Sequence, residues 1–65
     1  MHPLEIYLKK EGITQMEFAG KIGVSPAAIH YIINLKIFPS LKTAKKITDI
    51  TGIPILELLY PEGKP

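Results

Sequence analysis

The chain has 65 residues, a formal net charge of +2 and no cysteine. A chain of this length forms one domain, and without cysteine it can hold neither disulfides nor a thiolate-rich metal site, which points to the reducing cytoplasm as its compartment. No N-terminal charged segment precedes an apolar run, and no apolar stretch approaches membrane length, so export and membrane insertion are not expected.

Helical patterns occupy the whole chain, and no stretch alternates apolar and polar residues for long enough to predict a strand, so the expected class is all-α. Pro3 suits the first position of a helix over about residues 3–11. Leu4 and Leu8 lie on one face of that helix, and Gly12 can end it in the left-handed conformation.

Thr14 and Glu17 form a capping-box pattern, in which each side chain accepts the backbone N–H of the other residue. The box predicts a second helix over about 14–22, which Gly23 ends. Serine and proline residues mark the starts of three more helices. These predicted helices cover about 26–34, 41–51 and 54–60, with start signals at Ser25 and Pro26, at Ser40 and at Pro54.

The helices over 14–22 and 26–34 are joined by so few residues that they must cross sharply, as in a helix-turn-helix unit. Gly23 stands where this turn needs a positive φ, and Ala19 is small enough to let the two helices approach. The interior positions of the pair are apolar: Phe18, Ile22, Val24, Ile29 and Ile32.

This arrangement resembles the Cro and phage-repressor type (XRE-like) of helix-turn-helix domain. The stretch GITQMEFAGKIGVSPAAIHYI is similar to that family's second and third helices, NLKIFPSLKTAKKI to the segment into its fourth, and TGIPILELL to its closing helix. The resemblance implies a compact five-helix lambda-repressor-like domain. It also implies a transcriptional regulator of a bacterial or phage-infected cell that binds a double-stranded DNA operator as a homodimer.

In that family the third helix enters the major groove, which implies a set of base-facing residues: Pro26, Ala27, Ala28, His30 and Tyr31. Alanine methyl groups can contact a thymine methyl, and His30 or Tyr31 can hydrogen-bond to a base edge or a phosphate. Because no Arg, Lys, Gln or Asn lies near the start of this helix, we expect specificity that depends partly on DNA shape. The alternative is that His30 and Tyr31 are ordinary surface residues and the helix reads nothing.

The resemblance also implies phosphate contacts, from the helix starts and from the segment after the third helix: Thr14, Gln15, Asn34, Lys36, Ser40 and Lys42. Free N–H groups and the helix dipole favour a phosphate at such starts. Five lysines and no acidic residue lie between Glu17 and Asp49, a distribution that suits a polyanion. The alternatives are capping alone for Thr14 and Ser40, and a solvated helix face for the lysines.

Two features of the sequence depart from the family's pattern, one at a single residue and one at a pair of residues. Leu35 stands where many members have glycine, so we expect Asn34 to take the left-handed conformation at this helix exit. Leu8 and Ile33 stand where many relatives have an Arg and a Glu that pair. We predict that these two aliphatic side chains touch, because packed apolar groups can replace a buried ion pair without loss of stability.

Further apolar residues exceed what so small a core can cover: Ile37, Phe38, Ile55 and Leu59. Because family members often pair through the region of the fifth helix, Ile55 and Leu59 are the expected dimer interface.

An enzyme is not expected, because His2 and His30 lie far apart in the chain and neither a metal-ligand spacing nor a phosphate-binding glycine loop occurs. We therefore expect no catalytic residue, metal or cofactor. The alternative to a DNA-binding regulator is a protein-binding helical module, such as an antitoxin that docks a toxin through the third helix and the corner at Ile37 and Phe38.

Overall fold

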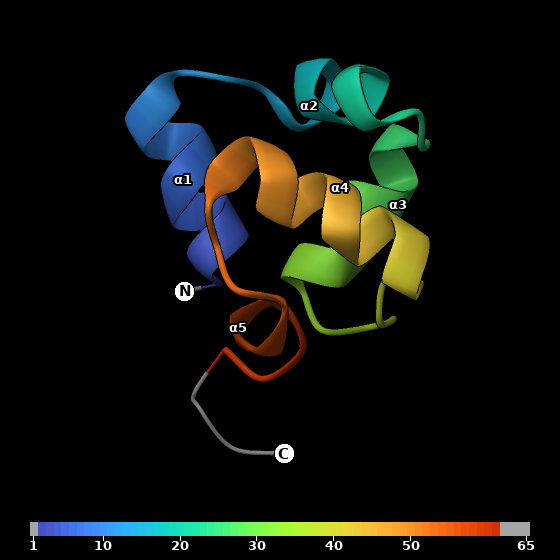
Figure 1. The fold of residues 1–65 in the computed structure, drawn as a ribbon. Coiled ribbons are helices and arrows are strands. Elements are labelled where there is room, and N and C mark those ends of the chain that lie inside the picture. The colour runs from blue at the N-terminus through green and yellow to red at the C-terminus, as the bar shows by residue number, and fades with distance from the viewer. Residues whose placement is uncertain (1, 62–65) are drawn as a thin grey trace.

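The computed structural model describes residues 2–61, which form five helices (Figure 1). The helices are α1 (Pro3–Glu11), α2 (Gln15–Ile22), α3 (Pro26–Ile33), α4 (Leu41–Thr51) and α5 (Ile55–Leu59). This part of the chain contains no strand, so the prediction of an all-α fold with five helices is confirmed. None of the five helices is long and apolar enough to cross a membrane.

Side-chain caps begin α2, α3 and α4. The Thr14 hydroxyl accepts the Glu17 backbone N–H at 3.0 Å, and the Glu17 carboxylate accepts the Thr14 N–H at 3.1 Å, which confirms the capping box. These hydrogen bonds with Thr14 hold the pKa of Glu17 below its usual value. The hydroxyls of Ser25 and Ser40 likewise accept N–H groups in the first turns of α3 and α4. Bonds between residues three apart therefore set the starts of three helices.

His2 caps α1 and ties the start of the chain to its last helix, a role that the sequence analysis missed. Its Nδ1 accepts the Leu4 backbone N–H at 3.0 Å, and its Nε2 lies 3.1 Å from the Leu58 carbonyl. Because Nδ1 accepts, the ring proton is on Nε2, which donates to Leu58. His2 is only 5% exposed, and this burial lowers its pKa despite the opposing effect of the Leu58 bond.

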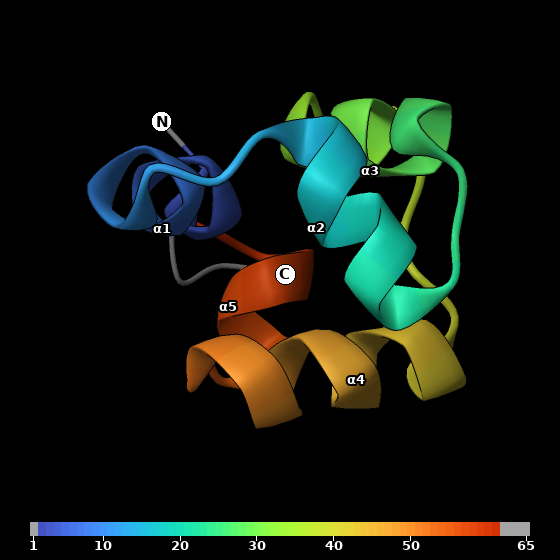
Figure 2. The same ribbon diagram turned by 90° about the horizontal axis from the view of Figure 1, so that it is seen from above.

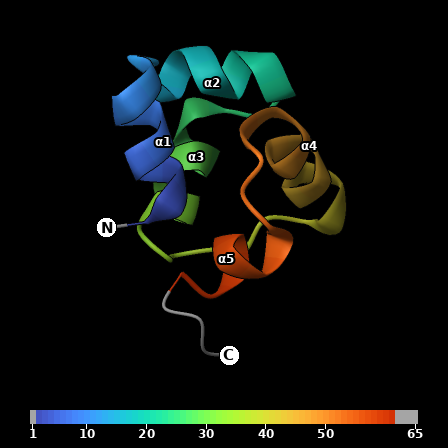
Figure 3. The same ribbon diagram turned by 60° about the vertical axis from the view of Figure 1, so that its left-hand side comes forward.

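The five helices enclose one apolar core (Figures 2 and 3). α2 packs against α3 and α4, while α5 packs against α1 and α4. Leu8 and Ile33 are both buried in the core, as the predicted contact between them requires, and the contact itself stays a prediction. The buried core residues are Leu4, Leu8, Phe18, Ala19, Ile22, Ile29, Ile32, Ile33, Ala44, Ile47 and Leu58.

The exit of α3 differs from the prediction. Asn34 has φ −91°, whereas Leu35 takes the left-handed conformation with φ 59°. The expectation for Asn34 was wrong because the chain reverses one residue later. The Leu35 N–H donates to the Ile32 carbonyl at 3.1 Å, and the N–H of Lys36 donates to the Tyr31 carbonyl at 2.8 Å. This is the Schellman arrangement, which needs left-handed backbone at the first residue beyond the cap.

Candidate nucleic-acid interface

The turn between α2 and α3 sets how the two helices cross (Figure 2). Gly23 has φ 78°, which confirms the predicted positive φ. The N–H groups of Gly23 and Val24 both donate to the Ala19 carbonyl, at 2.9 and 3.0 Å. Ala19 is completely buried, so its small side chain lies where a larger one would hold the helices apart. This closed turn fixes which side of α3 faces the core.

α3 buries one side and exposes the side that the sequence analysis assigned to DNA bases. The isoleucines at 29, 32 and 33 are buried, and Ala28 is half-buried. The exposed stripe offers only two side chains with polar groups, His30 and Tyr31, whose ring centroids lie 5.9 Å apart. α3 therefore presents few hydrogen-bonding groups before its C-terminal cap. The exposed members of the assigned set are Pro26, Ala27, His30 and Tyr31.

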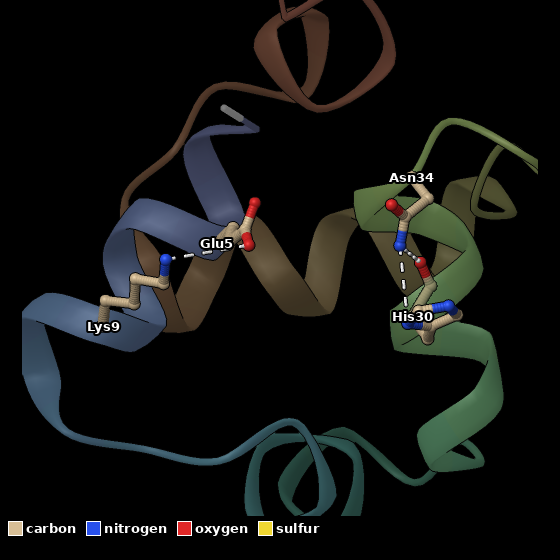
Figure 4. A network of polar contacts seen from close by, with 4 residues as sticks. All are labelled: Glu5, Lys9, His30 and Asn34. Carbon is tan, nitrogen blue, oxygen red and sulfur yellow. Dashed lines mark hydrogen bonds and ion pairs between the residues drawn. The ribbon is translucent and has the colours of Figure 1, made fainter.

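Asn34 contacts His30 twice across the last turn of α3 (Figure 4). The Asn34 Nδ2 donates to the His30 backbone carbonyl at 2.8 Å and lies 3.4 Å from the ring Nδ1. Both residues were predicted DNA contacts, but this contact between them was not predicted, although their spacing of four on a helix could have indicated it. Figure 4 also shows an ion pair on α1, in which Lys9 Nζ lies 4.0 Å from a Glu5 carboxylate oxygen. Lys9 is exposed and Glu5 is half-buried, so this pair lies at the surface and adds little stability.

The starts of α2 and α4 carry most of the residues assigned to phosphates. Thr14, Ser40 and Lys42 are exposed there, and Gln15 is half-buried. Each cap hydroxyl accepts the third N–H of its helix, so the first two N–H groups keep no partner within the helix. These two helix starts therefore retain the donors that an anion needs.

A large apolar side chain also projects at each of these starts, which the sequence analysis did not foresee. Met16 is 70% exposed at α2, and Leu41 is 69% exposed at α4. The buried residues of α4 are Ala44 and Ile47, and Leu41 is not among them. As the first residue of α4, Leu41 lies one turn before Ala44 and beyond the edge of the core.

The five lysines in the middle of the chain do not all lie in one place. Lys46 Nζ donates to the Ile22 carbonyl at 3.3 Å, at the end of α2. An open groove of about 430 Å³ between α2 and α4 is lined by Lys46 together with Lys21, Asp49 and neighbouring residues. Asp49 offsets part of the positive charge there. The exposed Lys36 and Lys42 are not among the residues that line this groove.

The linker between α3 and α4 exposes three apolar side chains. Leu35 is 56%, Ile37 45% and Phe38 64% exposed. The Phe38 ring packs edge-on against Tyr60, with ring centroids 6.1 Å apart. This contact places the linker beside the end of α5.

On α5, the two residues assigned to a dimer interface are only half-exposed. Ile55 packs against the core, and Leu59 is half-buried. Leu56, which the sequence analysis did not assign to any surface, is 70% exposed. Helical periodicity could have found it, because a helix that buries Leu58 points the residue two positions earlier away from the core.

Comparison with models of known protein families matches residues 4–58 to a family described as helix-turn-helix. The match begins in α1 and ends in α5, so it includes the turn at Gly23 and part or all of every helix. The comparisons with curated proteins and with solved structures returned no match.

Proposed function

This chain belongs to the helix-turn-helix family, in its Cro and repressor type, and we propose that it is a transcriptional regulator that binds double-stranded DNA sequence-specifically. In this proposal α3 enters the major groove, and the starts of α2 and α4 contact phosphates on either side. The observation that carries the proposal is the exposed side of α3, which the bonded turn at Gly23 holds away from the core.

The proposed base contacts come from Pro26, Ala27, Ala28, His30 and Tyr31. The first three are small, so they let α3 seat deeply and bring methyl groups to a thymine methyl. His30 and Tyr31 supply the hydrogen bonds. With so few polar groups, part of the sequence preference comes from the shape and deformability of the DNA.

The proposed phosphate contacts come from both helix starts and from the segment after α3. At α2 and α4 they use the free first-turn N–H groups together with Thr14, Gln15 and Ser40. Lys36 and Lys42 add positive charge and are exposed. Asn34 is the remaining residue that the sequence assigned to a phosphate, and its amide already bonds to His30.

We propose further that the protein acts as a homodimer, with Ile55 and Leu59 at the interface. The exposed Leu56 between them supports a contact in this region. A two-fold dimer would present two copies of α3 about 34 Å apart, one turn of DNA. Sedimentation of wild type and Leu56→Glu tests this, because an interface on α5 should dissociate when a charge is placed in it. Wild type that stays monomeric at high concentration would rule the dimer out.

The DNA-binding proposal is tested by selecting duplexes from a random pool and titrating the selected duplex at several salt concentrations. With about five phosphate contacts, the slope of log affinity against log salt should be about −4 to −5. A scrambled duplex of the same composition is the matched control and should bind more weakly with a similar slope. Equal affinity for both duplexes, or affinity that ignores salt, would contradict the proposal.

A protein-binding module, such as an antitoxin that docks a toxin, is the second candidate. It is favoured by the exposed apolar side chains of the linker, Leu35, Ile37 and Phe38. Binding through that surface would respond little to salt and would be lost in Phe38→Ser. The same substitution should leave DNA affinity nearly unchanged, which separates the two candidates.

A further inference from the structure

We infer that Asn34 is a positioning residue for His30: its amide holds the imidazole in the tautomer protonated on Nε2, so that α3 offers a hydrogen-bond donor to an acceptor on DNA. The part of this inference that concerns DNA rests on the proposed function. The pairing of Asn34 with His30 stands on the geometry of α3 alone.

Asn34 uses both of its amide hydrogens on one residue. Nδ2 carries two hydrogens, and it lies 2.8 Å from the His30 carbonyl oxygen and 3.4 Å from the His30 Nδ1 (Figure 4). The remaining polar atom of the side chain, Oδ1, can only accept. Asn34 therefore cannot donate to a phosphate without giving up one of these bonds, which assigns it a different role from the one the sequence suggested.

The chemistry of the imidazole then determines which ring nitrogen of His30 carries the proton. A neutral histidine has one ring N–H, and a ring nitrogen that accepts from an amide cannot carry it. With Nδ1 accepting from Asn34, the proton lies on Nε2, on the other side of the ring. His30 is exposed, so this N–H is open to a ligand.

Such an N–H donor binds hydrogen-bond acceptors on DNA. In the major groove it fits the N7 of a purine, the O6 of guanine or the O4 of thymine, and it is repelled by the amino groups of cytosine and adenine. A phosphate oxygen offers the same acceptor chemistry. All of these groups on DNA are hydrogen-bond acceptors. Because its tautomer is fixed, His30 binds an acceptor and not a donor.

The tautomer is measured directly in the full chain labelled with nitrogen-15, from long-range proton–nitrogen spectra of the histidine rings. The chain contains two histidines, and His2 serves as an internal reference, since its Nδ1 accepts from Leu4 and its proton is also on Nε2. Wild-type His30 should show protonation on Nε2. Asn34→Asp, which replaces the donor by an acceptor of equal size, should move the His30 proton to Nδ1 and leave the His2 signals unchanged.

A His30 protonated on Nδ1 in wild type, or identical His30 signals in wild type and Asn34→Asp, would overturn the inference. The spectra of the free protein decide this even if no DNA is bound. If the proposed function fails, the His30 ring will still show the expected tautomer, but the protein will bind no duplex. That result would overturn the proposed contact between His30 and DNA and would leave the hydrogen bond between Asn34 and His30 in place.

The DNA arm compares Asn34→Ala with wild type on the selected duplex and its single-base variants. If the acceptor is a base, the preference at one position should fall about threefold to tenfold, the range expected for one neutral hydrogen bond. If the acceptor is a phosphate, affinity should fall by a similar factor on every duplex. Lys36→Ala is the control, because it should weaken binding uniformly without changing the His30 tautomer. No change in either affinity or preference in Asn34→Ala would overturn the DNA role.

Discussion

At position 35, glycine should give a more stable protein than alanine, which reverses the usual order of these two residues. Leu35 has φ 59°, a conformation that brings the Cβ of an L-residue too close to the following carbonyl oxygen. The N–H groups of Leu35 and Lys36 close the turn, and both bonds are made by backbone atoms. A substitution that removes the Cβ therefore keeps the turn and relieves the crowding.

Two opposing effects set the expected difference in free energy of unfolding between Leu35→Gly and Leu35→Ala. The left-handed conformation costs about 1–2 kcal/mol in a residue with a Cβ. Glycine loses about 0.5–1 kcal/mol more backbone entropy on folding than alanine does. Both variants give up the same partial burial of the leucine side chain, so that contribution cancels between them. With the middle of each range, Leu35→Gly should thus exceed Leu35→Ala by about 0.75 kcal/mol in free energy of unfolding.

The assay is urea unfolding of the two variants at one pH, followed by circular dichroism, with thermal unfolding as a second measurement. A difference near 1 kcal/mol corresponds to about 4–8 °C in Tm for a domain of this size. Leu35→Asn should fall near the glycine variant, because asparagine tolerates left-handed backbone. If Leu35→Ala is as stable as Leu35→Gly, the strain argued for this residue does not exist.

Three further predictions test other parts of the molecule. A Cβ added to Gly20, in the middle of α2, meets nothing within 4 Å, so Gly20→Ala should stabilise the protein by about 1 kcal/mol in the same urea assay. A destabilised Gly20→Ala variant would show that the added methyl group clashes with a neighbour, against this prediction. Because burial lowers the pKa of His2 from 6.5, the unfolded chain binds a proton more readily than the folded chain, so stability should be full above pH 6.5 and decline as the pH falls below it. His2→Asn, which keeps a capping side chain, should show a flatter dependence, and equal pH profiles would refute this role. Lys36→Ala and Lys42→Ala should each lower affinity for all duplexes and reduce the salt slope by about 1, whereas Lys10→Ala on α1 should change neither if the DNA face is placed correctly.

The sequence by itself determined the helix starts and the turn between α2 and α3. The caps at Thr14, Ser25 and Ser40 are bonds between residues three apart, so the local order of residue types is sufficient to specify them. The positive φ at Gly23 and the burial of Ala19 also follow from a short stretch of chain. The exposed side of α3, which is the main part of the candidate interface, could be predicted for the same reason. The isoleucines of α3 recur at helical spacing and mark the buried side, so the remaining residues must lie on the exposed side.

Only the tertiary structure decided the features that depend on partners far apart in the chain or on where the chain must go next. The bond from His2 to the Leu58 carbonyl joins residues at opposite ends of the sequence. Lys46 donates to the Ile22 carbonyl at the end of α2, and no local sequence pattern indicates this contact. The left-handed residue after α3 is Leu35 rather than Asn34, because the closing bonds of the turn, and not residue preference, select the position. Local propensities differ by about 1 kcal/mol or less, so long-range packing and hydrogen bonds override them.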